Sequence, residues 1–427
     1  MELFHLPGEL MELEAAIEAA GQRMIERLQT LKTISSNKEW LERILFSPAA
    51  EEAAYRLKGW MGEAGMEVNY DALTNVTGWR SYAEAGNEAP AIHLGSHYDT
   101  VINAGAYDGT LGVVLAIAVA DVLNTAGVEM KHNLGVSAFC DEEGVRFQST
   151  FLGSGYLSGQ FEKDWLHMPD EYGKTLGEWL VDRAESIDEL LAAEPFIRPQ
   201  DYFLEAHIEQ GPVLEAAGRA LGVFTNIAAQ LRSEVEVIGE AGHAGTIPAR
   251  LRKDPLPYAC EMMLAVNQLC RSDERVRATV GQVEVRPNAS NVIPGSVRFT
   301  IDLRYPNEAG LTQAHEQLSA DLKAIALRSG LEFRYRVVHQ AGNVSCDAAL
   351  TDLLSGACEQ EQGDALRIFS GAGHDSMKVA GVCPVGLLAV RCRKGLSHHP
   401  DEFASEEDCL MALRVMLKAV LALDRQL

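Results

Sequence analysis

Three residues in one short segment, His97, Asp99 and Asp108, have the types and spacing of a metal site. Residues 91–112 read AIHLGSHYDTVINAGAYDGTLG, in which the apolar run 91–94 predicts a buried parallel strand and residues 111–122 predict a helix. In open α/β sheets, ligands bind beyond the carboxyl ends of the strands. An imidazole and carboxylates at that edge suit zinc or a similar divalent ion and indicate metal-dependent hydrolysis. The alternative is a polar loop with an ordinary strand-end histidine.

A second acidic segment follows another predicted strand. Residues 134–147 read LGVSAFCDEEGVRF, and the strand predicted over 134–139 leads into Asp141, Glu142 and Glu143. Adjacent carboxylates repel one another and need a counter-charge, a shared proton or open water. A divalent metal meets this need if one glutamate binds it while the other accepts a proton from water activated by the metal. An acidic turn facing solvent is the alternative, but two strand ends now supply ligands of the metal-binding type.

Histidines end two further segments. FLEAHIEQGP, residues 203–212, alternates apolar and polar residues, which predicts a half-buried strand with His207 at its far end. GLSHHPDE, residues 395–402, places His398 and His399 before a proline. A single histidine of this kind is more often structural than a ligand. Four such segments in one chain favour a metal site.

Eight strings between about residues 95 and 402 resemble one known family and occur in its order. They are GSHYDTV, AYDGTLG, DEEGVRFQSTFLGS, HIEQGPVLE, GHAGTIP, NASNVIPGSVRFTIDLR, SGAGHDSM and LSHHPDE. The chain resembles the amidase and carbamoylase branch of the dinuclear-metal M20 peptidase superfamily, which includes allantoate amidohydrolases, N-carbamoyl-L-amino-acid hydrolases and β-ureidopropionases. Within this branch, DEEGVRFQSTFLGS and VRCRKGLSH are most similar to allantoate amidohydrolases.

The resemblance implies two divalent ions per chain, Zn²⁺ or Mn²⁺, or alternatively Co²⁺, because all three suit histidine and carboxylate ligands. Asp108 matches the carboxylate that bridges both metals; His97 and His207 match ligands of the first, and Glu143 and His398 ligands of the second. His398 is preferred to its neighbour His399 because the family pattern reads Ser-His-x-Pro, although both side chains could reach a metal.

The resemblance also implies catalytic and substrate-binding residues. Glu142 matches the general base, and Asp99 matches a residue that orients His97 through its other ring nitrogen. Four residues match polar contacts to the substrate: Gln210, His243, Asn291 and Arg304. No role is assigned to His374, Asp375 or His399.

Two of these substrate residues also have a physical rationale of their own. The planar guanidinium of Arg304 could hold a carboxylate through two hydrogen bonds, a geometry that lysine cannot copy. His243, in the glycine-flanked string GHAG, could donate to a developing oxyanion. For Arg304, a salt bridge with Asp302 is the alternative.

Composition bounds the kind of protein. With 427 residues, 47% of them hydrophobic, the chain is long enough for two domains. Its net charge of −24 argues against nucleic acid or an anionic membrane as a partner, while a local arginine still allows an anionic substrate. Eight scattered cysteines without a CxxC pair, and an acidic N-terminal stretch unlike a secretory signal, predict a cytoplasmic protein.

The order of the elements predicts an α/β fold. Two helical strings within residues 10–65 precede alternating strands and helices, so we expect a catalytic domain with a mixed, mostly parallel sheet flanked by helices over residues 1–216 and 336–427. Strands that alternate over 233–238 and 296–303, with amphipathic helices over 256–269 and 311–327, predict an inserted α+β domain over 217–335. The resemblance implies that this insert is a dimerisation or lid domain, and hence a homodimer.

The implied reaction is the hydrolysis of a linear ureido or carbamoyl C–N bond in a small anionic substrate. Allantoate is favoured, giving ureidoglycine (and from it ureidoglycolate), ammonia and CO₂; an N-carbamoyl-L-amino acid or a β-ureidopropionate is the alternative. An aminoacylase or peptidase of the same superfamily is less consistent with the string DTVIN, because those relatives usually carry a proline soon after the HxD string. A catalytically inactive, metal-stabilised binding protein is the third hypothesis, which the presence of Glu142 opposes.

Overall fold

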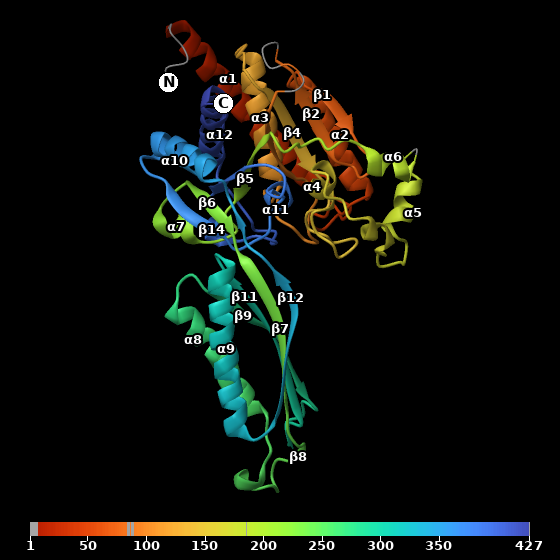
Figure 1. Cartoon of the computed structure of the whole chain (residues 1–427), viewed down its shortest axis with the longest axis vertical. Coiled ribbons are helices and arrows are strands. Elements are labelled where there is room, and N and C mark those ends of the chain that lie inside the picture. The colour runs from red at the N-terminus through yellow and green to blue at the C-terminus, as the bar shows by residue number, and fades with distance from the viewer. Residues whose placement is uncertain (1–6, 83–85, 87–88, 185, 427) are drawn as a thin grey trace. The chain divides into compact units, whose positions relative to one another are not determined.

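The chain folds around separate hydrophobic cores in two units, which the computed structural model describes over residues 7–82, 86, 89–184 and 186–426 (Figure 1). Unit 1 comprises Met1–Thr225, Cys346–Ile368 and Gly373–Leu427. Unit 2 comprises Asn226–Ser345 and Phe369–Ala372. Residues 1–6 lie outside the described residues. They begin the N-terminal stretch that we interpreted as unlike a secretory signal.

Unit 1 is built on a mixed β-sheet, as predicted. Its strands are β1 (Glu67–Tyr70), β2 (Val76–Arg80), β3 (Ala91–His97), β4 (Asn133–Phe139), β5 (Tyr202–Ile208), β6 (Leu221–Ile227), β14 (Leu366–Ser370) and β15 (Val385–Val390). They are ordered β1-β2-β4-β3-β5-β15-β6, with β14 also paired to β6. The central strands β4, β3, β5 and β15 are parallel, whereas β2 and β6 run antiparallel to their neighbours. The short β13 (Val344–Ser345) pairs with the part of β6 that lies in unit 2.

Helices flank this sheet. They are α1 (Pro7–Thr33), α2 (Pro48–Glu63), α3 (Thr110–Thr125), α4 (Leu152–Leu157), α5 (Leu176–Val181), α6 (Ile187–Ala192), α7 (Val213–Ala217), α10 (Ala348–Gln362), α11 (Ser376–Val379) and α12 (Glu406–Gln426). The central helix, α3, is buried along nearly its whole length between the sheet and α1, because its sequence is apolar on every face. No helix among the described residues is long and apolar enough to cross a membrane.

The parallel strands bring two predicted ligands to one edge of the sheet. β3 pairs with both β4 and β5 in parallel, so their carboxyl ends meet, and His97 and His207 lie at the ends of β3 and β5. The prediction that β5 is half-buried is wrong. Its polar residue Glu205 is fully buried, because Ser96 Oγ and the backbone N–H and hydroxyl of Ser376 satisfy its carboxylate.

Unit 2 is a four-stranded antiparallel sheet covered on one face by two helices. Its elements are β7 (Ala229–Ile238), β8 (Gly242–His243), β9 (Arg277–Arg286), β10 (Val292–Ile293), β11 (Ser296–Tyr305), β12 (Glu332–Ala341), α8 (Leu256–Ser272) and α9 (Glu308–Ser329). The sheet order is β12-β7-β11-β9. Alternate residues of β7 and β11, such as Val235 and Phe299, pack beneath α8 and α9. The residues between them, such as Glu234 and Arg298, pair on the opposite face.

The bounds of unit 2 differ from the predicted insert of 217–335 at both ends. Residues 221–224 belong to β6, which pairs with β15 in the sheet of unit 1. The chain therefore passes from unit 1 to unit 2 later than predicted, after Thr225. Residues 336–341 belong to β12, which pairs with β7 and completes the sheet of unit 2. Both shifts arise because a strand belongs with its hydrogen-bonded neighbour, which the local sequence pattern does not reveal.

Candidate metal centre

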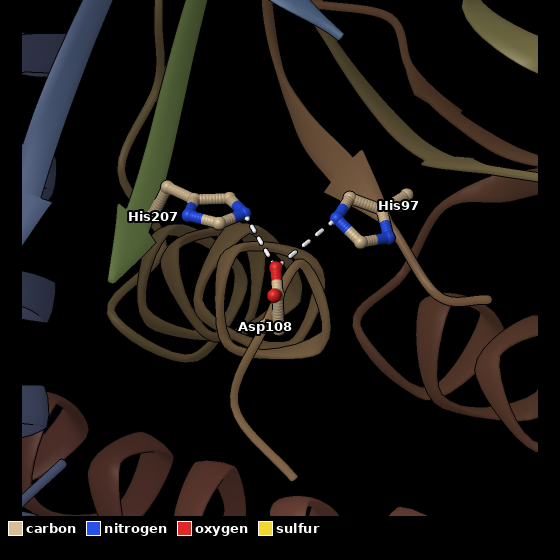
Figure 2. Close-up of side chains that lie close together, drawn as sticks. All are labelled: His97, Asp108 and His207. Atoms are coloured by element: carbon tan, nitrogen blue, oxygen red, sulfur yellow. Dashed lines mark ion pairs between the residues drawn. The ribbon is translucent and has the colours of Figure 1, made fainter. Parts of the chain in front are cut away.

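One carboxylate, that of Asp108, faces two buried histidines. Asp108 precedes α3, and its Oδ1 lies 3.5 Å from His97 Nε2 and 3.1 Å from His207 Nε2. Figure 2 shows the two rings reaching this carboxylate from the ends of β3 and β5. Their ligand-type atoms all lie within 4.8 Å of one another, and all three residues are buried. The three side chains are therefore close enough together to hold one cation.

The second oxygen of Asp108 faces a different pair of residues. Asp108 Oδ2 lies 3.3 Å from His398 Nε2, which in turn lies 3.4 Å from Glu143 Oε1. These three residues form a second group of ligand-type atoms within 4.8 Å of one another. His399 instead accepts a hydrogen bond at Nδ1 from the backbone N–H of Asp401. A carboxylate that offers one oxygen to each of two groups is arranged as a bridge between two ions.

Hydrogen bonds at the other ring nitrogens direct the histidines. His207 Nδ1 lies 2.9 Å from the carbonyl oxygen of Ile208, and His97 Nδ1 lies 3.2 Å from the carbonyl oxygen of Asp99. Carbonyl oxygens only accept, so each Nδ1 carries the proton and each Nε2 can direct a lone pair at a cation. The backbone N–H of Gly109 donates to His207 Nε2, which fits this tautomer.

Asp99 lies beside His97 Nδ1, the ring nitrogen through which we predicted that it orients the ring, and it contacts this atom with both its carbonyl and its carboxylate. Its backbone carbonyl is the closer partner of His97, since its carboxylate Oδ1 lies 3.6 Å from His97 Nδ1. The carboxylate also accepts hydrogen bonds from the backbone N–H groups of Glu142, at 3.0 Å, and Glu143, at 3.2 Å. Asp99 therefore links the segment that carries both glutamates to the end of β3, where His97 lies.

Glu142 is buried beside the first group of ligands. Its Oε2 lies 4.0 Å from His97 Nε2, close to the site but outside both groups of ligand-type atoms. Burial raises the pKa of Glu142 well above its usual value, and the charge of His97 opposes this rise. A raised pKa makes a carboxylate a stronger proton acceptor than an ordinary glutamate.

Electrostatics show that the residues fit a cation. Burial opposes protonation of His97, but hydrogen bonds to Asp108 and Asp99 raise its pKa well above its usual value. Hydrogen bonds to Asp108 and Glu143 raise the pKa of His398 to about 10. Without a metal, protons on these rings are the positive charge nearest the carboxylates. Divalent ions would replace them in a donor set of imidazoles and carboxylates, which suits zinc, manganese or cobalt.

Backbone geometry at the site is unusual. Asp141, Gln210 and His398 have φ values of 52°, 56° and 53°, in the left-handed region that non-glycine residues rarely adopt. Gly109 has φ of 60°, and a β-carbon there would lie 2.3 Å from His97 Nε2. Left-handed backbone at one candidate ligand, His398, and at residues close to others in the sequence is typical of a functional site.

Two residues that sequence reasoning missed hold Asp108 in place. Ser397 Oγ donates to Asp108 Oδ2 at 2.6 Å, and Glu402 Oε1 accepts from the backbone N–H groups of Asp108, at 3.0 Å, and Tyr107, at 2.8 Å. Burial, together with the charge of Asp108, raises the pKa of Glu402 to about 7. Both residues lie within the string LSHHPDE, but no local pattern predicts that they contact Asp108.

Gln210 lies at the same centre. Its Nε2 donates to Asp108 Oδ2 at 2.9 Å and to Ser397 Oγ at 3.0 Å. Its Oε1 is buried without a hydrogen-bond partner among the described residues. A buried acceptor in this state is a candidate contact for a ligand N–H.

Arg304, in unit 2, has the salt bridge that was the alternative to a substrate contact. Its Nε donates to Asp302 Oδ1 at 2.8 Å and its Nη2 to Asp302 Oδ2 at 3.0 Å, while Nη1 donates to the carbonyl of Gly371. These contacts use three of the five N–H groups of the guanidinium. Two N–H groups are left for a ligand.

Within unit 2, Arg304 lies far from His243 and Asn291. Arg304 pairs with Gln230 at one end of β11 and β7, whose other ends lie eight residues away, a length of about 26 Å. His243 and Asn291 lie beyond those other ends, where Ala244 donates to the carbonyl of Asn291, and Figure 1 shows β8 there. Within unit 2 of a single chain, Arg304 therefore does not lie close to His243 and Asn291.

The unassigned pair His374 and Asp375 is buried in unit 1. The ring of His374 lies edge-on to His207, with 4.4 Å between their centroids, and burial lowers the pKa of His374 well below its usual value. Both carboxylate oxygens of Asp375 are buried, and burial raises the pKa of this carboxyl well above its usual value. These residues surround the first group of ligands without belonging to it.

A family model, curated relatives and a solved structure all match most of this chain. Residues 93–422 match peptidase family M20/M25/M40. The chain is 38% identical to an allantoate deiminase of Arabidopsis thaliana, covering 90% of this chain and 79% of that protein. It is 34% identical to an N-carbamoyl-L-amino-acid amidohydrolase of Pseudomonas sp. (strain NS671), covering 95% and 99%. A crystal structure of a hydantoinase/carbamoylase family amidase from Burkholderia multivorans superposes with a TM-score of 0.87 at 32% identity, covering 94% and 97%.

Replacing Gly109 should disrupt the centre specifically. We expect Gly109→Ala to displace the His97 ring and to lower metal content sharply, because the new β-carbon would overlap Nε2. Gly127→Ala is the matched control, since Gly127 has the same φ of 60° but open space around it. Both variants should lose about 1–2 kcal/mol to backbone strain, and only Gly109→Ala should lose metal, measured by elemental analysis. Equal metal content in the two variants would contradict this interpretation of the site.

The two adjacent glutamates should differ in their effect on metal content. Glu143→Gln weakens the second group of ligands, so we expect one of two ions to be lost, whereas Glu142→Gln should keep both. Asp108→Ala removes the shared carboxylate and should lose both ions. Elemental analysis of protein reconstituted with Mn²⁺, Zn²⁺ or Co²⁺ measures each outcome. Loss of an ion from Glu142→Gln with full occupancy in Glu143→Gln would exchange the two roles.

Proposed function

The chain belongs to peptidase family M20/M25/M40, and we propose that it is an amidohydrolase that uses two divalent ions to cleave a linear ureido or carbamoyl C–N bond. The observation that carries this proposal is Asp108, whose two oxygens face two separate groups of metal-type ligands beside the buried Glu142. The choice of a ureido or carbamoyl bond is supported by relatives named allantoate deiminase and N-carbamoyl-L-amino-acid amidohydrolase. Allantoate is the favoured substrate.

The residues suggest how hydrolysis proceeds. Two divalent ions, when bound, would polarise the carbonyl and make water acidic enough to be deprotonated near neutral pH. Glu142 accepts a proton from the attacking water and returns it to the leaving nitrogen as the C–N bond breaks. Gln210 Oε1 accepts an N–H of the ureido group and so orients it. His243 donates to the carbonyl oxygen as negative charge develops there. With allantoate, loss of ammonia leaves a carbamate, which breaks its remaining C–N bond to release CO₂ and ureidoglycine, so that one water molecule is consumed in all.

The carboxylate of the substrate requires a local cation in a chain of net charge −24. We assign this role to Arg304, through the two N–H groups that Asp302 and Gly371 leave over, with Asn291 as a further polar contact. An N-carbamoyl-L-amino acid carries the same carboxylate and the same ureido group. It is therefore the second candidate substrate, and β-ureidopropionate the third.

A substrate panel on reconstituted protein tests the proposed reaction. We expect faster ammonia release from allantoate than from N-carbamoyl-L-amino acids, with little cleavage of N-acetyl amino acids or dipeptides. Glu142→Gln should lower kcat at least about 100-fold, the smaller end of the loss for a general base. Greater release of free amino acid from the N-carbamoyl compounds would assign the chain to carbamoylases. Cleavage of dipeptides alone, or of nothing in the panel, would exclude the proposal.

We propose further that the active form is a homodimer. His243 and Asn291 lie about 26 Å or more from Arg304 within unit 2, so one small substrate cannot contact all three residues of the same chain. Arg304 of one chain can act on the same substrate as His243 and Asn291 of another chain. The edge strand β9, which carries the exposed Val283, leaves one side of the unit 2 sheet unpaired and offers a surface for association.

Purified mixed dimers test this arrangement. We combine one His243→Ala chain with one Glu142→Gln chain, using two affinity tags to isolate the heterodimer. If His243 serves the partner's site, one of the two sites has both a wild-type Glu142 and a wild-type His243. Activity should then reach about half that of the wild-type dimer. Each variant homodimer is the inactive control. A heterodimer as inactive as these controls, or a monomeric wild type, would contradict the arrangement.

We also propose a cytoplasmic location. All eight cysteines are free thiols and five of them are buried, which is consistent with a reducing compartment. Buried thiols contribute to the core as small apolar side chains. Fractionation of the native host, with an antibody to the chain, tests the location.

A further inference from the structure

Arg43 is a buried arginine, 1% exposed, in the segment between α1 and α2. Its guanidinium donates in three directions: Nε to the carbonyl of Tyr98 at 3.0 Å, Nη2 to Thr110 Oγ1 at 2.9 Å and Nη1 to the carbonyl of Leu31 at 2.7 Å. Its backbone N–H also donates to Thr100 Oγ1 at 2.9 Å, and its carbonyl accepts from the N–H of Thr100 at 3.1 Å. Arg43 thus joins the end of α1 to the segment that follows β3.

The contacts of Arg43 flank two of the candidate metal ligands. Tyr98 directly follows His97, and Thr110 comes two residues after Asp108. The loop between these contacts, residues 98–110, leads from β3 to α3, and its two ends converge on one guanidinium. Arg43 touches neither ligand, but it contacts residues close to both in the sequence, and His97 Nε2 lies 3.5 Å from Asp108 Oδ1.

The charge of Arg43 has no carboxylate partner within ion-pair distance among the described residues. Arg27, another buried arginine, pairs with Asp121 at 2.6 Å, whereas the partners of Arg43 are carbonyl and hydroxyl oxygens. Burying a cation in this way is costly, and burial lowers the pKa of Arg43 to about 10 even though the charge of Asp99 opposes this. An apolar side chain would fill the space at less cost, so the contribution of Arg43 lies in its directed hydrogen bonds.

We propose that Arg43 is a positioning residue of the metal centre: it holds the two ends of loop 98–110 at the separation at which His97 and Asp108 bind one ion. This inference rests on the metal centre proposed above. A lysine keeps the charge but has a single ammonium, which cannot reach Tyr98, Thr110 and Leu31 at once. The planar fork of the guanidinium, rather than its charge, does the positioning.

Geometry and charge predict opposite changes in metal affinity. Arg43→Met removes a positive charge close to a cation site, so electrostatics alone would strengthen the binding of a divalent ion. Loss of positioning would instead weaken it, because His97 and Asp108 would no longer be held at one separation. The sign of the change therefore separates the proposed role from a role of the charge alone.

The test is a Co²⁺ titration of the full chain after removal of metal with a chelator. Visible absorption reports the geometry around the ion, and competition with a chelator gives its affinity. We expect Arg43→Lys and Arg43→Met to bind Co²⁺ about 10- to 100-fold more weakly, the usual loss when a residue that orients metal ligands is replaced. Thr110→Val deletes one acceptor of the guanidinium and nearly keeps the shape of the side chain, so it should give a smaller loss in the same direction. The Co²⁺ spectrum of all three variants should change.

Arg27→Lys is the matched control, because Arg27 is also buried and contacts α3, but at Asp121, eleven residues beyond Thr110. It should lower the unfolding temperature and leave Co²⁺ affinity and the spectrum unchanged. If Arg43→Met does not fold, Arg43→Lys and Thr110→Val carry the test.

Three results would overturn the inference. Folded Arg43 variants with wild-type or tighter affinity would exclude positioning. An equal loss in Arg27→Lys would reduce the effect to general loosening of the fold. Failure of the wild-type chain to bind Co²⁺ at all would refute the metal centre itself. The wild-type titration alone shows this outcome, so it is distinguished from failure of the role of Arg43.

Discussion

The carboxylate of Asp108 must serve two groups of ligands at once, and much of unit 1 constrains it to do so. Its Oδ1 faces the histidines at the ends of β3 and β5, and its Oδ2 faces His398, with Ser397 and Gln210 donating to the same oxygen. A carboxylate can hold this position only if its backbone is also fixed. Glu402 fixes it from the amide side, and the absence of a side chain at Gly109 lets the turn into α3 pass close beneath the His97 ring. The parallel pairing of β3 and β5 brings the two rings to one edge, and the apolar α3 buries the turn between them.

Burial of so many acids in one place has an electrostatic cost that the protein alone meets only in part. Asp108, Glu142 and Asp375 are all nearly inaccessible to water, and burial raises the pKa of the last two well above their usual values. The three histidine contacts hold the pKa of Asp108 well below its usual value against the effect of burial. Imidazolium protons are a weak substitute for two divalent ions, so bound metal would stabilise the native state as well as supply reactivity.

The sequence predicted the parts of the centre that depend on strand ends, because apolar runs followed by histidine or acid locate the carboxyl edge of a parallel sheet. It did not predict Arg43, Ser397 or Glu402, whose role depends on contacts with residues 55 to 295 positions away. Alternation along residues 203–208 suggested a half-exposed strand, since nothing local shows that Glu205 has buried partners. The bounds of the insert were missed at both ends for the same reason: β6 and β12 are assigned to their units by pairing. Resemblance suggested roles for Arg304 and His243, but only the length of β7 and β11 shows how far apart they lie.

The two groups of ligands differ in their access to water. His97 and His207 are buried, with side chains 2% and 1% exposed, whereas the side chain of His398 is 51% exposed. An ion in the inner position can leave only after buried groups move aside, but an ion in the outer position can exchange ligands with solvent one at a time. If two ions bind as proposed, the ion between His97 and His207 would therefore exchange more slowly than the ion beside His398. A metal supplied after folding would then enter the half-exposed group first, and replacement of the buried ion would require local opening of the chain around His97 and His207.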